Sequence, residues 1–242
     1  MTEVGLSSLG FFQQLHGHYD HALKQALAAE SVMQPRVIDA LLAMAWGSFD
    51  ANVEAQCEGL PPLDCHKGCA TCCTLRVTAT APEVLMLARF IRALHPALLQ
   101  RGIDLPAQVA SADTCTQGLD EPQRIAMRQR CPFIAQGVCV IYQVRPLACR
   151  GLASYDKRAC AQAASGKIDA IPYSEPHMRM RSLVQNALQS ALRDARLAWG
   201  SYELNQALTL ALQDPALEQR WLSGDDVFAD AQVHEVDSAE MA

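Results

Sequence analysis

The chain has 242 residues, of which 50% are hydrophobic and 19% charged, and its formal net charge at pH 7 is −6. This apolar content is enough for a buried core, which excludes a disordered or fibrous chain, and the length fits one domain with helical extensions. An acidic chain is repelled by phosphate backbones, so we expect no nucleic-acid partner. The N-terminus lacks a secretory signal pattern, and no apolar run reaches the roughly 18 residues of a membrane span. We therefore expect a cytoplasmic protein with no membrane partner.

Apolar residues at helical spacing predict two N-terminal helices. The first is capped by Ser8 and runs to about Glu30, and the second begins at Pro35. Their predicted core faces are Phe11, Phe12, Leu15, Tyr19, Leu23 and Leu27, and then Ile38, Leu41, Leu42, Met44, Ala45 and Phe49. The histidines of the first helix (His16, His18 and His21) do not share one face, so we expect them to face solvent rather than bind metal.

The same periodicity predicts further helices after residue 80, and the abundance of Ala and Leu favours helix over sheet. They are expected at Ala81–Arg101, as one or two short helices within 104–130, from Glu175 to about Trp199 with Gly200 as the stop, and at Tyr202–Leu212. An acidic, frayed tail is expected from Ser223. The basic clusters (Arg124, Arg128 and Arg130; Arg179 and Arg181) are expected to form solvated helix faces.

The ten cysteines require an explanation, because thiols in a reducing cytoplasm rarely pair as structural disulfides. Two stretches interrupt the helical pattern, at 59–80 and at 131–150, and most of the cysteines lie in or beside them. Clustered cysteines in this setting indicate metal ligands or redox groups, with disulfides as the alternative.

The first stretch has the pattern C-x3-C-x2-C-C, formed by Cys65, Cys69, Cys72 and Cys73. A two-residue gap lets successive thiolates face one metal ion, and Gly68 permits the backbone turn that this requires. Adjacent side chains of an extended chain point to opposite sides. The pair Cys72 and Cys73 therefore serves two centres, or one sulfur bridges two metals, or one is unbound. His66 could ligate but is expected to face solvent.

In the second stretch, two short strands are predicted around a Gln136–Gly137 turn, followed by a helical turn that opens at Arg145–Pro146. This arrangement brings Cys131, Cys139 and Cys149 to one end of the unit. The positive end of the helix dipole is expected to lower the pKa of Cys149. Four thiolates on a divalent ion carry a net charge of about −2, which Arg145 and Arg150 would offset, with a surface ion pair as the alternative for each arginine.

Four further residues have less defined roles. Cys160 could complete a second four-sulfur set. Cys57 and Cys115 are expected to be ordinary small apolar residues. Tyr142 is expected to pack, with its hydroxyl group hydrogen-bonded near the cluster.

The run CPFIAQGVCVIYQVRPLACR (131–150), with CHKGCATCC (65–73) upstream, resembles the YkgJ-type cysteine-cluster family, also called the CxxCxxCC family. The matching positions are Cys65, Cys69, Cys72, Cys73, Cys131, Pro132, Phe133, Gly137, Cys139, Ile141, Tyr142, Arg145, Pro146, Cys149 and Arg150. The resemblance covers about 65–160 and implies a domain that chelates zinc or iron, with an iron–sulfur cluster as one form. A relative of this family, the flagellin lysine N-methylases, has a similar cluster. The present chain lacks a glycine-rich loop for S-adenosylmethionine, so methylation is not implied.

The sequence therefore predicts a mainly α, single-domain protein with a small Cys-rich loop and β-hairpin unit that binds metal. We expect this unit at about 57–160, helical flanks at 8–56 and 175–222, and an acidic tail at 223–242. The expected metal ligands are Cys65, Cys69, Cys72, Cys73, Cys131, Cys139 and Cys149, with Arg145 and Arg150 beside the bound zinc or iron.

Three functions are compatible with such a unit. The metal could be structural and fasten residues 74–130 to the core, since metal affinity then becomes folding free energy. The thiolates could instead hold the centre of an iron–sulfur enzyme or redox protein, for example one that acts in protein modification, or the protein could sequester and deliver the ion. Soft thiolates favour zinc, iron–sulfur or copper(I), and no other catalytic motif is found.

Overall fold

The computed structural model describes residues 7–28, 35–168 and 170–233. Its helices are α1 (Ser8–Ala28), α2 (Pro35–Gln56), α3 (Ala81–Leu99), α4 (Leu105–Thr116), α5 (Glu121–Met127), α6 (Leu147–Gly151), α7 (Lys157–Ala164), α8 (Glu175–Asp194), α9 (Leu204–Gln213) and α10 (Leu217–Leu222). The strands are β1 (Thr78–Ala79), β2 (Ile134–Ala135), β3 (Val138–Cys139) and β4 (Tyr202–Glu203). The protein is mainly α, as the sequence predicts.

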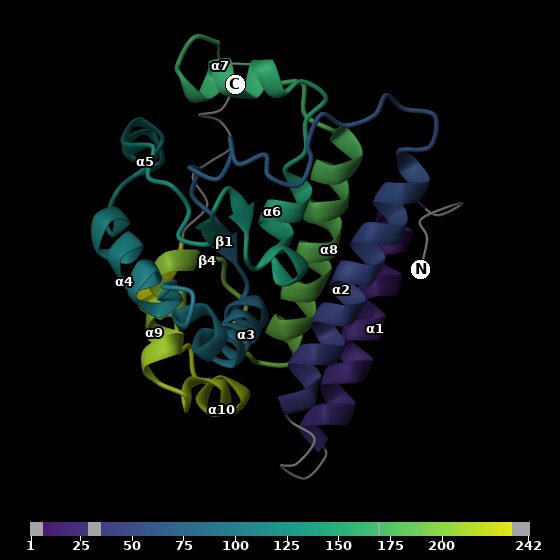
Figure 1. The fold of residues 1–242 in the computed structure, drawn as a ribbon. Coiled ribbons are helices and arrows are strands. Elements are labelled where there is room, and N and C mark those ends of the chain that lie inside the picture. The colour runs from purple at the N-terminus through teal and green to yellow at the C-terminus, as the bar shows by residue number, and fades with distance from the viewer. Residues whose placement is uncertain (1–6, 29–34, 169, 234–242) are drawn as a thin grey trace.

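Three long helices, α1, α2 and α8, lie side by side along one flank of the molecule (Figure 1). The inward face of α1 buries Phe11, Leu15, Tyr19 and Leu23, which recur every four residues. Because this spacing places them on one stripe of the helix, their burial against α8 removes most of the apolar surface of α1 from water. The predicted core faces of α1 and α2 are thus confirmed in their main positions.

The N-terminal cap of α1 differs from the prediction by one residue. The backbone N–H of Gly10 donates to Ser7 Oγ at 3.1 Å, so Ser7 caps the helix and Ser8 is its first residue. The predicted end at Glu30 lies outside the described residues.

On the opposite flank, α3 packs against α9, and α4 and α10 lie beside them (Figure 1). Strand β1 pairs antiparallel with β4, with Thr78 opposite Glu203 and Ala79 opposite Tyr202. This two-stranded link joins the chain before α3 to the chain before α9. We call α1, α2, α3, α8 and α9 the helical frame.

Two predicted helix boundaries near residue 200 are wrong. Helix α8 ends at Asp194 rather than near Trp199, because Arg196 takes a left-handed conformation (φ 59°) and the N–H of Leu197 bonds back to Leu192 O at 2.9 Å. Such a turn satisfies the last carbonyls of a helix and redirects the chain. Tyr202 begins a strand rather than a helix, and α9 starts two residues later.

The predicted fraying from Ser223 is also wrong as far as Val233, the last described residue. The side chains of Phe228 and Ala231 are buried in the core, and Tyr202 donates its hydroxyl hydrogen to Asp226 Oδ1 at 3.0 Å. The apolar residues of this stretch therefore contribute to folding although the segment is acidic. Residues 234–242 lie outside the described part.

The basic clusters are not all solvated. Arg124 on α5 is only 6% exposed, and its guanidinium group lies 3.2 Å from Glu203 Oε1. Arg181 on α8 packs so closely on Gly151 of α6 that a Cβ atom at Gly151 would lie 2.5 Å from Arg181 Cβ. The glycine therefore allows α6 to approach α8 closely.

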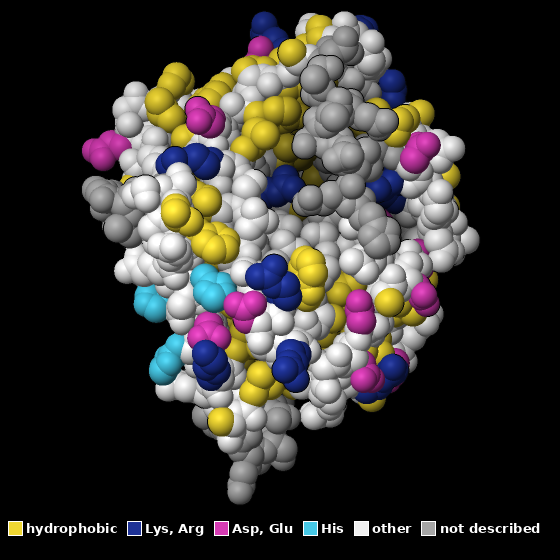
Figure 2. All heavy atoms as spheres, turned by 180° about the vertical axis from the view of Figure 1, so that it is seen from behind, with side chains coloured by type: hydrophobic (Ala, Val, Ile, Leu, Met, Phe, Trp, Pro, Cys, Tyr) yellow, Lys and Arg dark blue, Asp and Glu magenta, His cyan; other side chains and the backbone are white. Residues whose placement is uncertain are grey.

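The face of the molecule opposite to the view of Figure 1 has mixed charge. Figure 2 shows Lys and Arg side chains interspersed with Asp and Glu on this face, with hydrophobic side chains scattered between them. Within the described ranges, no helix is long and apolar enough to cross a membrane.

Candidate metal centre

Ten cysteines are present as free thiols, and most of them lie in two segments outside the helical frame. We call residues 57–77 and 131–160 the cysteine segments. Figure 1 shows the first of these leaving the end of α2 and crossing to β1, beneath α7 and above the small hairpin. Both segments thus lie in the upper half of this view, with α7 at the top and α6 nearer the middle.

The first cysteine segment is a series of tight turns. The N–H groups of Cys69, Cys73 and Leu75 donate to the carbonyl oxygens three residues earlier, at 3.0 to 3.1 Å. Gly68 has φ 94°, a value that other residues rarely adopt, so it allows the first of these turns. Every residue of 57–77 is at least partly exposed, so turns rather than a buried apolar face shape this segment.

The two cysteine segments are joined directly through their backbones. The N–H of Cys131 donates to Cys73 O at 2.7 Å. An added Cβ atom on Gly68 would lie 3.9 Å from Gly137 O, so the first turn lies against the hairpin turn. Cysteines that are about sixty residues apart in the chain are therefore brought to one place.

The predicted hairpin is confirmed. Strands β2 and β3 pair antiparallel, with Ile134 opposite Cys139, and both turn residues, Gln136 (φ 51°) and Gly137 (φ 80°), have positive φ. Positive φ at both positions gives a two-residue turn whose twist matches that of the strands.

Helix α6, which carries Cys149, is held by a buried carboxylate of the helical frame. Glu83, in the first turn of α3, is 1% exposed. Its Oε1 accepts from the N–H of Leu147 at 2.7 Å, and its Oε2 accepts from the N–H of Thr80 at 2.8 Å. One carboxylate therefore satisfies backbone donors at the starts of both α3 and α6. The sequence placed Glu83 in a first helical turn but gave no signal for its bond to Leu147.

Cys131, Cys139 and Cys149 form one neighbourhood, which we call the hairpin group. Burial raises the pKa of Cys131 to about 11 and raises that of Cys149 further, with the neighbouring thiols adding to both shifts. Cys72 is an electrostatic neighbour of Cys131 and Cys149. The expected lowering of the Cys149 pKa by the helix dipole is thus wrong, since α6 is only five residues long and desolvation of the thiolate outweighs its short dipole.

Cys65, Cys69 and Cys160 form a second neighbourhood, which we call the loop group. Partial desolvation raises the pKa of Cys65 although its side chain is exposed, and its neighbours Cys69, Cys72 and Cys160 raise it further. The N–H of Ser154 donates to Cys65 Sγ at 3.3 Å and partly offsets this rise. An N–H group aimed at a sulfur atom stabilises the thiolate form of that sulfur.

Cys72 has electrostatic neighbours in both groups, and Cys73 is joined to Cys131 through its backbone. A hydrogen bond between their side chains, followed by burial, raises the pKa of Cys72. Cys72 interacts electrostatically with Cys65 of the loop group as well as with the hairpin group. Cys72 and Cys73 are thus the part of the chain where the loop group and the hairpin group meet.

Arg145 is placed beside the hairpin group. Its positive charge opposes the rise in the pKa of Cys72, Cys139 and Cys149. Its guanidinium carbon lies 4.0 Å from the ring centre of Tyr142. That ring is 46% exposed, so Tyr142 is a platform for Arg145 rather than a packed core residue, in contrast to the prediction.

Arg150 connects α2 to the chain that carries Arg145. Its Nη1 lies 3.3 Å from both carboxylate oxygens of Asp50, while Nε donates to Arg145 O at 3.1 Å and Nη2 donates to Gln143 O at 2.6 Å. The Asp50 contact corresponds to the ion-pair alternative. The two backbone bonds fix the chain that carries Arg145.

The remaining candidates lie at the edge of the site. His66 is exposed and its Nδ1 lies 2.9 Å from Asp64 O, so it faces solvent as expected. Cys57 is partly buried, with Sγ 3.9 Å from Nδ1 of His177. Cys115 is a free, exposed thiol on α4, away from both cysteine groups.

The chemistry of this arrangement fits a soft metal ion. Burial and mutual repulsion disfavour free thiolates here, and a divalent cation would remove both costs by neutralising the sulfur charges. Among the described residues, no three His, Cys, Asp or Glu side chains are arranged as the ligands of one ion. Coordination therefore requires thiol side chains to turn inward from the positions seen here.

These observations define the class of the protein: it carries a thiol-rich unit that is held on a helical frame. Residues 64–166 match the sequence model of the CxxCxxCC family, described as "Putative zinc- or iron-chelating domain". The resemblance found in the sequence is thereby confirmed, and the matched segment contains both cysteine groups. No curated protein and no solved structure matches the chain.

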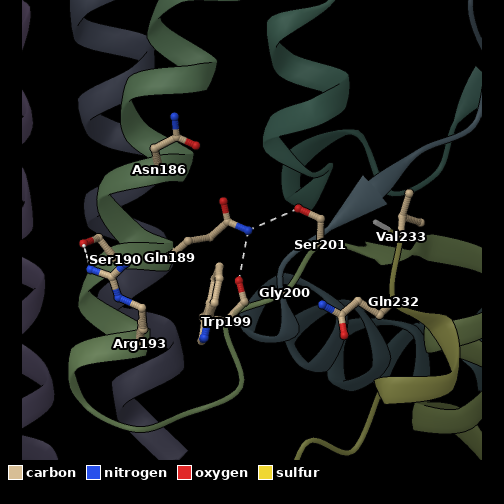
Figure 3. Close-up of a pocket in the computed structure, with 9 residues that line it drawn as sticks. All are labelled: Asn186, Gln189, Ser190, Arg193, Trp199, Gly200, Ser201, Gln232 and Val233. Atoms are coloured by element: carbon tan, nitrogen blue, oxygen red, sulfur yellow. Dashed lines mark hydrogen bonds between the residues drawn. The ribbon is translucent and has the colours of Figure 1, made fainter. Parts of the chain in front are cut away.

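A cavity of about 390 Å³ lies away from the cysteines, between α8 and the chain around residues 199–201. Figure 3 shows Gln189 reaching across it from α8, where its Nε2 donates to Trp199 O at 2.9 Å and to Ser201 Oγ at 3.1 Å. None of the residues that line it is a cysteine, so this cavity is not part of the candidate metal centre.

Proposed function

We propose that the protein binds zinc or iron through the thiolates of Cys65, Cys69, Cys72, Cys73, Cys131, Cys139 and Cys149, and that the metal is structural. The convergence of the two cysteine segments carries this proposal, above all the backbone bond from Cys131 N to Cys73 O at 2.7 Å. The family match at residues 64–166 supports the choice of zinc or iron.

A structural metal explains why the cysteine segments have a defined shape without a large core of their own. Residues 74–130, which include α3, α4 and α5, leave the site at Cys73 and return to it at Cys131. A metal bound at this junction closes that long loop and fastens it to the frame. Structural zinc contributes on the order of 10 kcal/mol to folding in small domains.

The arginines support the same function by charge. Four thiolates on a divalent ion carry a net charge of about −2, which a nearby guanidinium group offsets. Arg145 is a direct counter-charge for Cys139 and Cys149, and Arg124 acts in the same way on Cys131. Arg150 acts through the backbone of Arg145 and Gln143.

The test is anaerobic purification of the full chain with metal analysis and a visible spectrum. Cys139→Ser is expected to lower metal content and stability together, because it removes a ligand. Cys115→Ser, at an exposed thiol outside both groups, is the matched control and is expected to keep its metal. Absence of stoichiometric metal from the wild-type chain would contradict the proposal.

The same measurement separates two other functions. The number of clustered thiols, which exceeds the four ligands of one closed zinc site, favours an iron–sulfur centre in a redox protein or enzyme. A brown protein with iron and acid-labile sulfide would support that function. The exposure of Cys65 favours metal handling, which would give substoichiometric and readily exchanged metal.

A further inference from the structure

We propose that the cavity between α8 and residues 199–201 binds a neutral pyranose sugar, which stacks on the indole ring of Trp199 and forms hydrogen bonds with the side-chain amides around it. The cavity has a volume of about 390 Å³, within the roughly 300–1,000 Å³ of small-molecule sites. None of the described residues that line it is a cysteine, so this inference goes beyond the proposed metal binding and does not depend on it.

One wall of the cavity is a stripe of α8. Asn186, Gln189 and Arg193 recur at intervals of three and four residues and all line the cavity. This spacing places them on one face of the helix. The opposite face of α8 is buried in the core, through residues such as Val184 and Ala191. The core therefore fixes the helix, and its polar face is left to the cavity.

The other wall consists of two chain segments that are hydrogen-bonded to each other. The N–H of Val233 donates to Ser201 O at 2.8 Å, and Tyr202 forms an antiparallel bridge with Gln232. Gln189 ties this wall to α8, because its Nε2 donates to Ser201 Oγ at 3.1 Å (Figure 3). Both walls are thus in place before a ligand arrives, which lowers the ordering cost of binding.

Trp199 carries an aromatic ring that the fold covers only in part. Its side chain is 48% exposed, although Leu197 and Ala198 before it are buried. Its backbone is held on both sides, since Trp221 Nε1 donates to Ala198 O at 3.2 Å and Gln189 Nε2 donates to Trp199 O at 2.9 Å. A large, flat apolar surface on a fixed backbone beside a cavity is a platform on which a ligand ring can stack.

The amide groups around this ring have unused hydrogen-bonding capacity. Among the described residues, the side-chain amides of Asn186 and Gln232 have no hydrogen-bond partner, and Gln189 is engaged only through its Nε2. A carboxamide group both donates and accepts hydrogen bonds. A sugar hydroxyl group does the same, so each amide can pair with a hydroxyl group in either direction.

The charge of the lining excludes other classes of ligand. Arg193 is the one cation among the described residues that line the cavity, and none of them is a carboxylate. Its guanidinium group is exposed and already lies 3.5 Å from Asp194 Oδ1, which is too little positive charge for a polyphosphate. A purely apolar ligand would take the polar groups out of water without replacing their hydrogen bonds. A neutral ligand with several hydroxyl groups has neither disadvantage.

The test uses the fluorescence of the full chain, which has three tryptophans. Trp221 is fully buried and Trp46 is partly buried, whereas Trp199 is 48% exposed. Trp199 therefore dominates the fraction of the fluorescence that acrylamide quenches. The probes are glucose, galactose, mannose and N-acetylglucosamine at millimolar concentration, with glycerol as the control. We expect at least one sugar to lower the quenched fraction in a saturable manner, and glycerol to leave it unchanged.

Variants of the lining connect this signal to the cavity. Asn186→Ala removes an exposed amide, so it should leave the thermal melt unchanged and raise the dissociation constant about fivefold. Trp199→Ala should raise it about tenfold or more, measured by saturation-transfer NMR of the sugar, which needs no fluorescence. Ser182→Ala, one turn before Asn186 on α8 and outside the cavity, is the matched control and should bind as the wild type does.

Two results would overturn the proposal. One is the absence of saturable protection by all of these sugars, and the other is an unchanged dissociation constant in both Asn186→Ala and Trp199→Ala. Adenosine is a further probe, because a purine base also stacks on an indole ring. Protection by adenosine and by none of the sugars would show that the cavity takes a base, and the sugar would then be wrong.

Discussion

The helical frame and the cysteine segments are stabilised in different ways. Helix α8 buries seven residues within its 20, whereas every residue of the first cysteine segment is at least partly exposed. The frame is held by the removal of apolar surface from water. The first cysteine segment has backbone turns instead, and the second combines a hairpin with three residues of the core, Phe133, Ile141 and Leu147. The comparison indicates that the frame folds on its own core, and it leads to the expectation, under the proposed function, that the cysteine segments are the part that a bound metal stabilises most.

Metal removal is the strongest way to break this comparison. Treatment of the full chain with a chelator should cost on the order of 10 kcal/mol locally, because the ligands lose the ion that joins them. We expect hydrogen exchange to accelerate at 57–77 and 131–160 while α1, α2 and α8 remain protected. Equal acceleration in both regions, measured peptide by peptide with mass spectrometry, would show that frame and site form one cooperative unit.

Truncation of a core side chain in the frame should lower the stability of the protein and leave its metal content unchanged. Leu188→Ala in α8 removes a fully buried side chain and should lower the free energy of unfolding by about 2–5 kcal/mol. Metal content per folded molecule should stay unchanged, because Leu188 lies outside both cysteine groups. Urea unfolding with metal analysis checks both quantities. Ser182→Ala, at an exposed position of the same helix, is the control and should change stability by less than about 0.5 kcal/mol.

A rise in pH should lower the stability of the metal-free chain but raise the affinity of the chain for Zn²⁺. Burial raises the pKa of Cys131 to about 11 in the fold, against about 8.5 for a free thiol. The metal-free chain should therefore lose stability as the pH rises through this interval, by on the order of 3 kcal/mol in total from this group.

Metal binding, in contrast, displaces protons from the thiols, so the affinity for Zn²⁺ should fall as the pH is lowered. Urea midpoints of the metal-free chain from pH 8 to pH 11, compared with Cys131→Ser, test the first trend. A stability of the metal-free chain that does not change with pH would mean that Cys131 is not buried as a thiol.

The smallest expected effect concerns the hairpin turn. Gln136 has φ 51°, and asparagine before glycine is favoured in a turn with two positive φ angles. Gln136→Asn should therefore stabilise the protein by up to about 1 kcal/mol, because asparagine tolerates the left-handed conformation better than glutamine does. The same change at Gln13, an exposed position within α1, should destabilise it, because asparagine is a weaker helix former. A thermal melt of the two variants gives the comparison, and the same sign in both would contradict it.

The long helices could be predicted because their apolar residues repeat with helical spacing over several turns. The end of α8 could not, since the left-handed conformation of Arg196 is set by the burial of Leu197 and neither residue is a usual stop signal. The same limit applies to Tyr202, whose strand depends on pairing with Ala79 from a distant part of the chain.

For the candidate site, the local pattern indicated the hairpin, the turn at Gly68 and the two groups of motif cysteines. The proximity of Cys160 to Cys65 depends on hydrogen bonds between residues 64–65 and 154–157, which no local pattern encodes. The prediction for the pKa of Cys149 is wrong because burial, the dominant cause of its rise, is a property of the whole fold.

The shared carboxylate of Glu83 makes the site and the frame mechanically continuous. It binds the start of α6 and the start of α3 at once, and its charge also acts on Tyr19 in the middle of α1. An inward shift of Cys149 would pull on Leu147 and, through this single side chain, on two helices of the frame. A displacement of α6 would thus be transmitted to the start of α3 through the two oxygens of one buried carboxyl group.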